Sequence, residues 1–203
     1  NPTALENLTP EERGRLSYVW ELWARPEQLP PEGDWQTWLA LAGRGWGKTR
    51  VGSEWINACV RKGATRAGNG NGLGIALVAP TWDDGRDIMI HGESGIINCA
   101  PPDFRPVWLD RHLKWPDGQW ARLYSADRPD RLRGKQHAIA WCDELAAYRY
   151  PEAYAQGQFG LRLGSNPQCL ITTTPRPTQI IRDFLADFAR QGPNGSIRVV
   201  RGS

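Results

Sequence analysis

A glycine-rich turn, Gly43-Arg44-Gly45-Trp46-Gly47-Lys48-Thr49, follows an apolar run at 38–41 and precedes a segment with helical periodicity. Small residues let successive backbone N–H groups close around a phosphate, and the positive end of the following helix adds to the attraction. In such a loop Lys48 contacts the β- and γ-phosphates, and the hydroxyl of Thr49 is a ligand of Mg²⁺. Ala42 replaces the first glycine of the usual pattern and is small enough to keep this assignment.

Two residues inside this turn and one before it are further candidates for nucleotide contact. Arg44 is either a second cation on the phosphates or an ordinary surface arginine, and Trp46 packs either beside the nucleotide or against a neighbour. Gln28 lies twenty residues ahead of Lys48, and in helicase-like ATPases a glutamine at about that distance reads the adenine; Gln36 is a weaker candidate. The alternative is that both glutamines are exposed connector residues and that the turn binds nothing.

A second pattern places two adjacent carboxylates, Asp143 and Glu144, at the end of the apolar run 139–142. Burial of such a strand fixes the pair, and consecutive side chains point in different directions. In an enzyme that hydrolyses a nucleoside triphosphate, Asp143 would hold Mg²⁺ through a water, and Glu144 would orient or deprotonate the attacking water. A P-loop kinase does not need the second carboxylate, because its acceptor is a bound substrate. Without the glycine-rich turn, the same pattern is a strand that ends in a solvated acidic pair.

Between these two patterns lies a basic segment, residues 125–135, with several arginines and a lysine. It is a solvated loop, a DNA-contacting patch or the source of an arginine finger, which stabilises charge on the transferring phosphoryl group. For a finger the pattern favours Arg133 over Arg131 and Arg128, because Gly134 frees the backbone to present it.

A third apolar run, 169–173, ends in Thr172, Thr173 and Thr174. Hydroxyls at the tip of the strand beside the acidic one can sense the γ-phosphate and pass its loss to the rest of the domain. Threonine is also common in strands, so β-propensity alone accounts for these residues equally well.

The elements that must position these residues follow from hydrophobic periodicity and from turn signals. Thr9 caps a helix that continues through Trp23 and stops before Pro26, where a proline-rich connector begins. Residues 101–108 are expected to be irregular. Strands are expected at 38–41, 73–79, 113–115, 119–124, 138–142, 169–173 and 197–200, and helices at 9–25, 50–62, 82–91 and 178–190. Strands separated by helices predict a mostly parallel α/β sheet with the site at its carboxyl edge.

Composition limits the class of protein. The chain has 203 residues, 40% of them hydrophobic and 23% charged, with a net charge of +3, which fits one globular domain and does not by itself predict nucleic-acid binding. Four scattered cysteines predict reduced thiols in a cytoplasmic protein, and no apolar run approaches the length of a membrane span. The chain lacks an initiator Met, and a strand-like segment ends just before Ser203, so we expect that a further domain could follow.

Together, these patterns resemble the ATPase domain of a large terminase subunit, the DNA-packaging motor of tailed bacteriophages and gene transfer agents. The pieces that carry the resemblance are 43–49, 130–134, 141–145, 161–164 and 170–177. The resemblance implies a P-loop NTPase of the additional-strand, catalytic-glutamate type, with ATP and Mg²⁺ as its ligands. It implies an arginine finger acting in trans, assigned to Arg133, and a coupling motif, assigned to Thr172, Thr173 and Thr174.

The resemblance also implies partners and a division into parts. Such subunits form a ring, usually of five, on the portal protein of an empty capsid, work with a small terminase subunit, and pump double-stranded DNA inward in the host bacterial cytoplasm, away from any membrane. Residues 1–34 would be a helix and connector within the ATPase domain, and 35–203 its core. Whole large terminases carry a nuclease domain after the ATPase, and nothing after Val200 could supply it, so this chain should hydrolyse ATP and not cut DNA. The alternatives are a helicase or other nucleic-acid-remodelling ATPase, and an assembly module gated by nucleotide without turnover.

Overall fold

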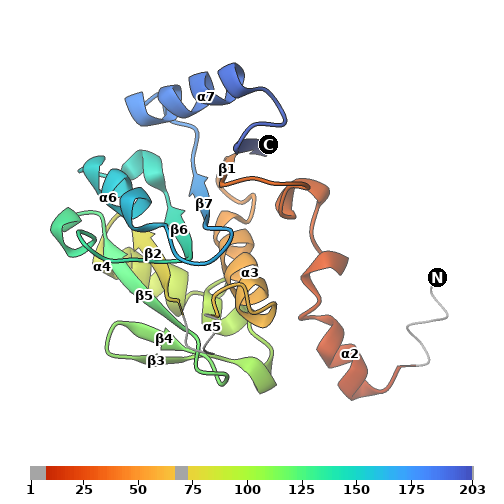
Figure 1. Cartoon of the computed structure of the whole chain (residues 1–203). Coiled ribbons are helices and arrows are strands. Elements are labelled where there is room, and N and C mark those ends of the chain that lie inside the picture. Colours follow the sequence, from red (N-terminus) through yellow and green to blue (C-terminus); the bar gives the residue numbers. More distant parts are fainter. Residues whose placement is uncertain (1–7, 67–72, 203) are drawn as a thin grey trace.

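The computed structural model describes residues 8–66 and 73–202, and within them the chain builds one eight-stranded sheet. Figure 1 shows this sheet with helices on both sides. Its strand order is β3-β4-β5-β2-β6-β7-β1-β8. The strands are β1 Thr37–Ala42, β2 Ile75–Ala79, β3 Val107–Leu109, β4 His112–Lys114, β5 Trp120–Ser125, β6 Ile139–Asp143, β7 Gln168–Thr173 and β8 Ile197–Gly202.

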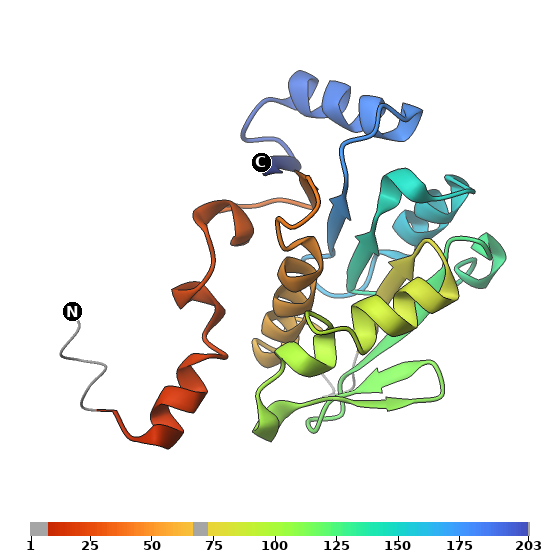
Figure 2. The same ribbon diagram turned by 180° about the vertical axis from the view of Figure 1, so that it is seen from behind.

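The central strands are buried on both faces, as their continuous apolar runs predict. One face packs against α3 (Lys48–Arg61) and α5 (Ile96–Cys99), and the other against α6 (Glu152–Gly160) and α7 (Gln179–Gln191). Figures 1 and 2 show these layers from opposite sides. A two-faced sheet covered by helices confirms the predicted α/β class.

The order of the strands identifies the subclass of the fold. β7 lies between β1, which leads into the glycine-rich turn, and β6, which carries the two carboxylates, and it pairs in parallel with both. This is the additional strand that the sequence analysis expected. Because β1, β6 and β7 are parallel, their carboxyl ends meet at one edge of the sheet.

One edge of the sheet is antiparallel. The predicted hairpin is present, because β4 pairs with β5 on either side of Pro116–Gly118. The expectation that residues 101–108 are irregular is wrong at its end: β3 begins at Val107 and pairs with β4. The β3–β4 turn contains Asp110 and Arg111, both with positive φ. A three-residue strand whose outer side chains are exposed has no periodicity long enough to recognise.

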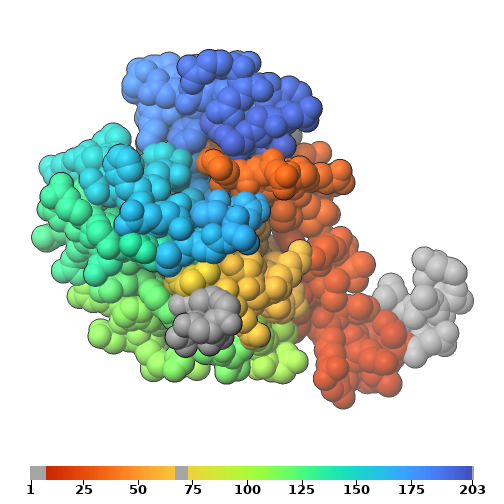
Figure 3. Space-filling view, viewed as in Figure 1, coloured from red at the N-terminus to blue at the C-terminus, as the bar shows by residue number. Residues whose placement is uncertain are grey.

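The N-terminal segment differs from its prediction. The α2 helix (Pro10–Leu16) has the expected capping box between Thr9 and Glu12, but it ends at Leu16 and does not continue to residue 25. No residue of α2 is buried, and Trp23 is largely exposed, so a longer helix would have gained no packing. Figure 3 shows this segment, drawn in red, extending from one side of the body.

Two other helical segments also differ from the prediction. Residues 82–91 are helical as expected, but α4 covers only Trp82–Asp84 and continues as a π-helix, Gly85–Ile90. The α6 helix was not predicted, since its sequence contains two glycines and no apolar stripe. All four cysteines are buried and unpaired. In the described ranges no helix is both long and apolar enough to cross a bilayer.

A close contact joins α3 to the sheet. A Cβ atom on Gly52 would lie 2.1 Å from two ring atoms of Trp141. Both groups are in the core, so the helix or the indole would have to move. We expect Gly52→Ala to lower the free energy of unfolding by about 1 to 3 kcal/mol, measured by urea denaturation.

The matched control is Gly157→Ala in α6, where an added Cβ would meet nothing within 4 Å. Alanine there should leave stability unchanged or raise it by about 0.5 to 1 kcal/mol. Equal effects of the two substitutions would contradict the close contact between α3 and Trp141.

Candidate functional site

The glycine-rich turn leads from β1 directly into the N-terminus of α3. Gly45 and Gly47 have φ values of 78° and 93°, in the left-handed region that side chains disfavour. Gly47 occupies the cap position, and no side chain caps the helix. The first backbone N–H groups of α3 therefore have no carbonyl partner in the helix and are directed toward the turn. This is the arrangement that binds anions at helix N-termini.

Lys48 places its ammonium group at the centre of this turn. The residue is only 9% exposed, and Nζ donates to the carbonyl oxygens of Ala42 and Gly43 at 3.2 and 3.0 Å. Nζ also lies 3.2 Å from Oε1 of Glu144. The turn and the acidic strand are therefore joined by one nearly buried ion pair.

Asp143 is buried at the end of β6 and is held by a chain of hydrogen bonds. The indole of Trp141 can only donate, so the hydroxyl of Thr172 accepts its N–H at 2.8 Å and gives its own hydrogen to Oδ1 of Asp143 at 2.6 Å. Burial raises the pKa of Asp143 to about 6, against the opposing effects of Thr172 and Lys48. The charge of Lys48, the first residue of α3, acts on this carboxylate, and Thr49 follows Lys48 in the helix. A carboxylate and a hydroxyl are oxygen donors of the kind that a hard cation such as Mg²⁺ prefers.

Glu144 adopts a left-handed backbone conformation, φ 47° and ψ 47°, which is uncommon for residues other than glycine. Its carboxylate accepts two hydrogen bonds from Thr174, one from the backbone N–H and one from the hydroxyl, both at 3.0 Å. With the Lys48 contact, these bonds fix the carboxylate over the turn while leaving its side chain 30% exposed. Water can therefore reach a carboxylate that is already oriented.

The predicted coupling residues all lie at this edge. Thr172 and Thr174 bond Asp143 and Glu144 respectively, and the hydroxyl of Thr173 accepts the backbone N–H of Ala146 at 3.0 Å. The tip of β7 is thus tied to both carboxylates and to the segment after them. The sequence analysis placed the threonines beside the acidic strand, but nothing in the sequence indicated the bond from Trp141.

The interpretation of Gln28 as an exposed residue of the connector is wrong. The residue is 5% exposed, and its amide donates to the carbonyl oxygen of Trp46 at 2.8 Å, as does the guanidinium of Arg25. Gln28 therefore braces the turn, and a role in reading adenine stays a prediction. Gln36, the weaker candidate, is exposed.

The side chain of Trp46 is directed into the protein. A Cβ atom on Gly202 would lie 2.0 Å from Nε1 of Trp46, so the indole packs flat against the end of β8. The guanidinium of Arg25 lies 5.6 Å from the centre of its ring. The indole thus packs against a neighbouring part of the chain, and a place for Trp46 beside the nucleotide stays a prediction. Arg44 is exposed and remains a candidate second cation.

The arginines of the basic segment are not brought to this centre. Arg128, Arg131 and Arg133 are exposed and follow β5, which is separated from β1 by three strands of the sheet. His137, which follows this segment, is buried, and burial lowers its pKa to about 4. An arginine finger from this segment would have to reach the turn of another copy, and this role stays a prediction.

Comparison with known proteins gives a family and a fold. The family model described as terminase large subunit, T4likevirus-type, N-terminal, matches residues 39–196. The ATPase domain of the Thermus phage P74-26 large terminase is similar in structure, with a TM-score of 0.59 at 19% identity over 89% of this chain and 80% of that one. A search of curated proteins found no match.

Two whole large terminases are also similar in structure. That of the thermophilic bacteriophage D6E in complex with ADP has a TM-score of 0.57 at 14% identity, covering 91% of this chain and 43% of that one. That of bacteriophage HK97 has a TM-score of 0.55 at 15% identity, covering 95% and 39%. At these identities the likeness shows the fold, and this chain spans less than half of each whole terminase.

Proposed function

Because the chain belongs to the family of phage large terminase N-terminal domains, we propose that it hydrolyses ATP at the turn and carboxylates described above and thereby drives DNA into a capsid. The observation that carries the proposal is the 3.2 Å contact between Lys48 and Glu144, which joins the phosphate-binding turn to a carboxylate still reached by water. ADP bound to the D6E terminase supports a nucleotide at this fold.

In the proposed mechanism, the N–H groups of residues 43–49 and the ammonium of Lys48 bind the phosphates. Thr49 and, through a water, Asp143 would hold Mg²⁺, and the ion would neutralise charge on the phosphate oxygens. Lys48 leaves the carbonyls of the turn for the β- and γ-phosphates, which are stronger acceptors. The turn fixes the substrate in one position, so that the reaction depends on orientation and charge and not on a covalent intermediate.

Glu144 supplies the base. Its two bonds from Thr174 and its contact with the ammonium of Lys48 hold the carboxylate in place. A water that donates to this carboxylate loses its proton to it as the water oxygen attacks the γ-phosphorus. The bond from the γ-phosphorus to the β–γ bridging oxygen breaks, and ADP leaves with that electron pair. Loss of phosphate then changes the charge facing Lys48, Asp143 and Glu144, and the bonds from Thr172 and Thr174 transmit the change to β7.

The assembly belongs to the same proposal. Copies form a ring, of five by family resemblance, in which Arg133 of one copy completes the site of the next. The partners are double-stranded DNA, the portal protein and the small terminase subunit, in the host cytoplasm during virion assembly. In the whole protein a nuclease domain would follow, with residues 1–34 and 35–203 forming the ATPase domain.

The test is phosphate release from ATP with and without Mg²⁺. Lys48→Ala is expected to lower turnover by about 10²- to 10³-fold, since it removes a preorganised cation from the phosphates. The matched control is Lys62→Ala at the exposed C-terminal end of the same helix, which should keep full turnover. Full activity of Lys48→Ala, or activity independent of Mg²⁺, would refute the site.

A further inference from the structure

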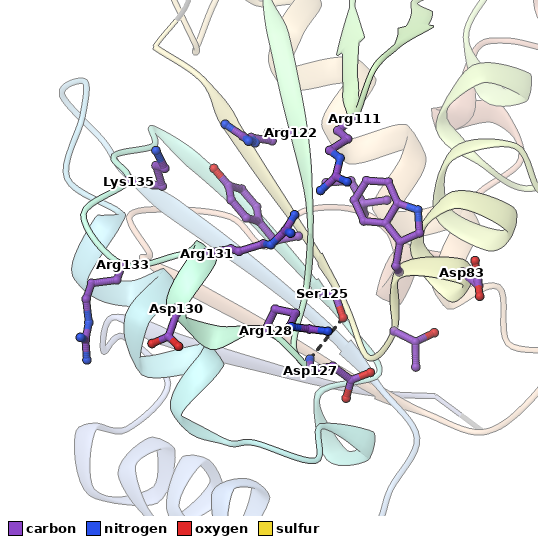
Figure 4. A pocket seen from close by; sticks show the side chains of 14 residues that line it. Asp83, Arg111, Arg122, Ser125, Asp127, Arg128, Asp130, Arg131, Arg133 and Lys135 are labelled. Carbon is purple, nitrogen blue, oxygen red and sulfur yellow. Dashed lines mark hydrogen bonds between the residues drawn. The ribbon is translucent and has the colours of Figure 1, made fainter.

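A groove of about 710 Å³ lies at the ends of β2 and β5, outside the site described above. Cationic side chains dominate its lining, and Figure 4 shows them around the groove. We call this feature the basic groove; its cations are Arg111, Arg122, Arg128, Arg131, Arg133 and Lys135. Three aspartates also line it, so the cations outnumber the carboxylates by two to one.

The charges of the basic groove are not neutralised within the chain. In residues 8–66 and 73–202, none of the six cations lies within 4.0 Å of a carboxylate oxygen. Asp83, at one end of the groove, pairs instead with Arg86 outside it. Like charges gathered in one groove repel each other, and an external anion would relieve that repulsion.

Aromatic rings support two of these cations without neutralising them. The guanidinium of Arg111 lies 4.9 Å from the centre of the Trp82 ring, and that of Arg122 lies 5.7 Å from the centre of the Tyr124 ring. Stacking of this kind orients the planar group and leaves its edge N–H donors available. Two guanidinium groups that are already held in position are suited to bind phosphate oxygens.

The chemistry of the lining distinguishes a nucleic acid from a protein partner. The largest exposed apolar side chains, such as Leu22, Trp23 and Phe159, all lie outside the groove. Protein interfaces are depleted of charge at their core, whereas interfaces with nucleic acid are far more positive. We propose that the basic groove binds the phosphate backbone of DNA. This inference rests on the proposed function, for which it names the surface that holds the DNA.

The proposed finger, Arg133, is one of the cations that line the basic groove. In Figure 4, Arg131 extends toward Arg111, whereas Arg133 extends in the opposite direction. Arg133 also lines a second pocket, together with Arg128, Arg131, Arg149 and Tyr150. Arg111 and Arg122 line the basic groove and not the second pocket, so substitution of these two can separate DNA binding from ATP hydrolysis.

The test is the affinity for two 30-base-pair duplexes of unrelated sequence, measured by fluorescence anisotropy over a series of salt concentrations. The variant is Arg111→Ala with Arg122→Ala, which are remote from the phosphate-binding turn. We expect it to weaken binding of both duplexes by about 10-fold and to lower the slope of log affinity against log salt by about two, one for each phosphate contact removed. ATP turnover without DNA should not change.

The matched control removes two exposed cations at the end of α3, Arg61→Ala with Lys62→Ala, and keeps the same net charge as the variant. It should bind DNA as the unsubstituted protein does. Arg131→Ala with Lys135→Ala, both exposed, repeats the test should the first pair disturb folding.

Several results would overturn the proposal. They are unchanged affinity in both groove variants, an equal loss in the control, a loss for one duplex only, and no DNA binding by the unsubstituted protein at low salt. Weaker self-association with normal DNA affinity would assign the groove to contact between copies instead. Absence of ATP turnover in the unsubstituted protein would refute the proposed function and leave the DNA measurement interpretable.

Discussion

Glu144→Gln is expected to lower ATP turnover by about 10²- to 10⁴-fold while leaving ATP affinity unchanged. The amide has the shape of the carboxylate, and its carbonyl oxygen can still accept a hydrogen bond from Thr174. It cannot take a proton from water. Because Lys48 and the N–H groups of the turn are untouched, binding should be preserved. Single-turnover phosphate release, together with titration of a fluorescent ATP analogue, separates the two effects.

A matched control for this substitution is Glu152→Gln at the exposed start of α6, which should have normal turnover. If Glu144→Gln also had normal turnover, Glu144 would not be the base. If the unsubstituted protein bound ATP without turnover and the substitution changed nothing, the chain would be a nucleotide-gated assembly module.

The turn, the acidic strand and the threonines could be recognised from sequence because each is a short contiguous pattern. The apolar residues before Asp143 predict a buried strand, and the acidic pair Asp143-Glu144 predicts where that strand ends. The parallel arrangement then follows from alternation of strands and helices. The apolar residues of the N-terminal segment led to the wrong prediction of a helix as far as residue 25. Periodicity describes the spacing of apolar residues, and it does not show whether the chain offers a surface for them to pack against.

Contacts between residues that are far apart in the chain cannot be recognised from any short stretch of the sequence. Trp141 and Thr172 meet because β6 and β7 are neighbours in the sheet. Arg111 and Arg122 line the same groove because β4 pairs with β5, with His112 opposite Arg122. Gln28 contacts the glycine-rich turn because of the course of the connector, and the connector sequence does not predict that course. These positions depend on strand order and register, which only the folded chain defines.

Arg133→Ala is expected to lower ATP turnover of the assembled protein by about 10³- to 10⁵-fold, the range for loss of an arginine finger. The residue is exposed and follows a strand far from the turn, so it can act only on the site of a neighbour. Turnover per subunit should therefore rise with protein concentration in the unsubstituted protein and stay low in the variant. Steady-state phosphate release over a concentration series measures both.

Mixing the two inactive variants provides the decisive control. An Arg133→Ala copy keeps Glu144, and a Glu144→Gln copy keeps Arg133. A site that combines the turn and Glu144 of the Arg133→Ala copy with Arg133 of the Glu144→Gln copy is therefore complete. We expect turnover to return when the variants are mixed, although each alone is inactive. Arg131→Ala, two residues away and equally exposed, keeps both groups and should hydrolyse ATP without a partner variant. A mixture that stays inactive, with each variant still assembling and binding ATP, would show that the finger is not Arg133 or does not act in trans.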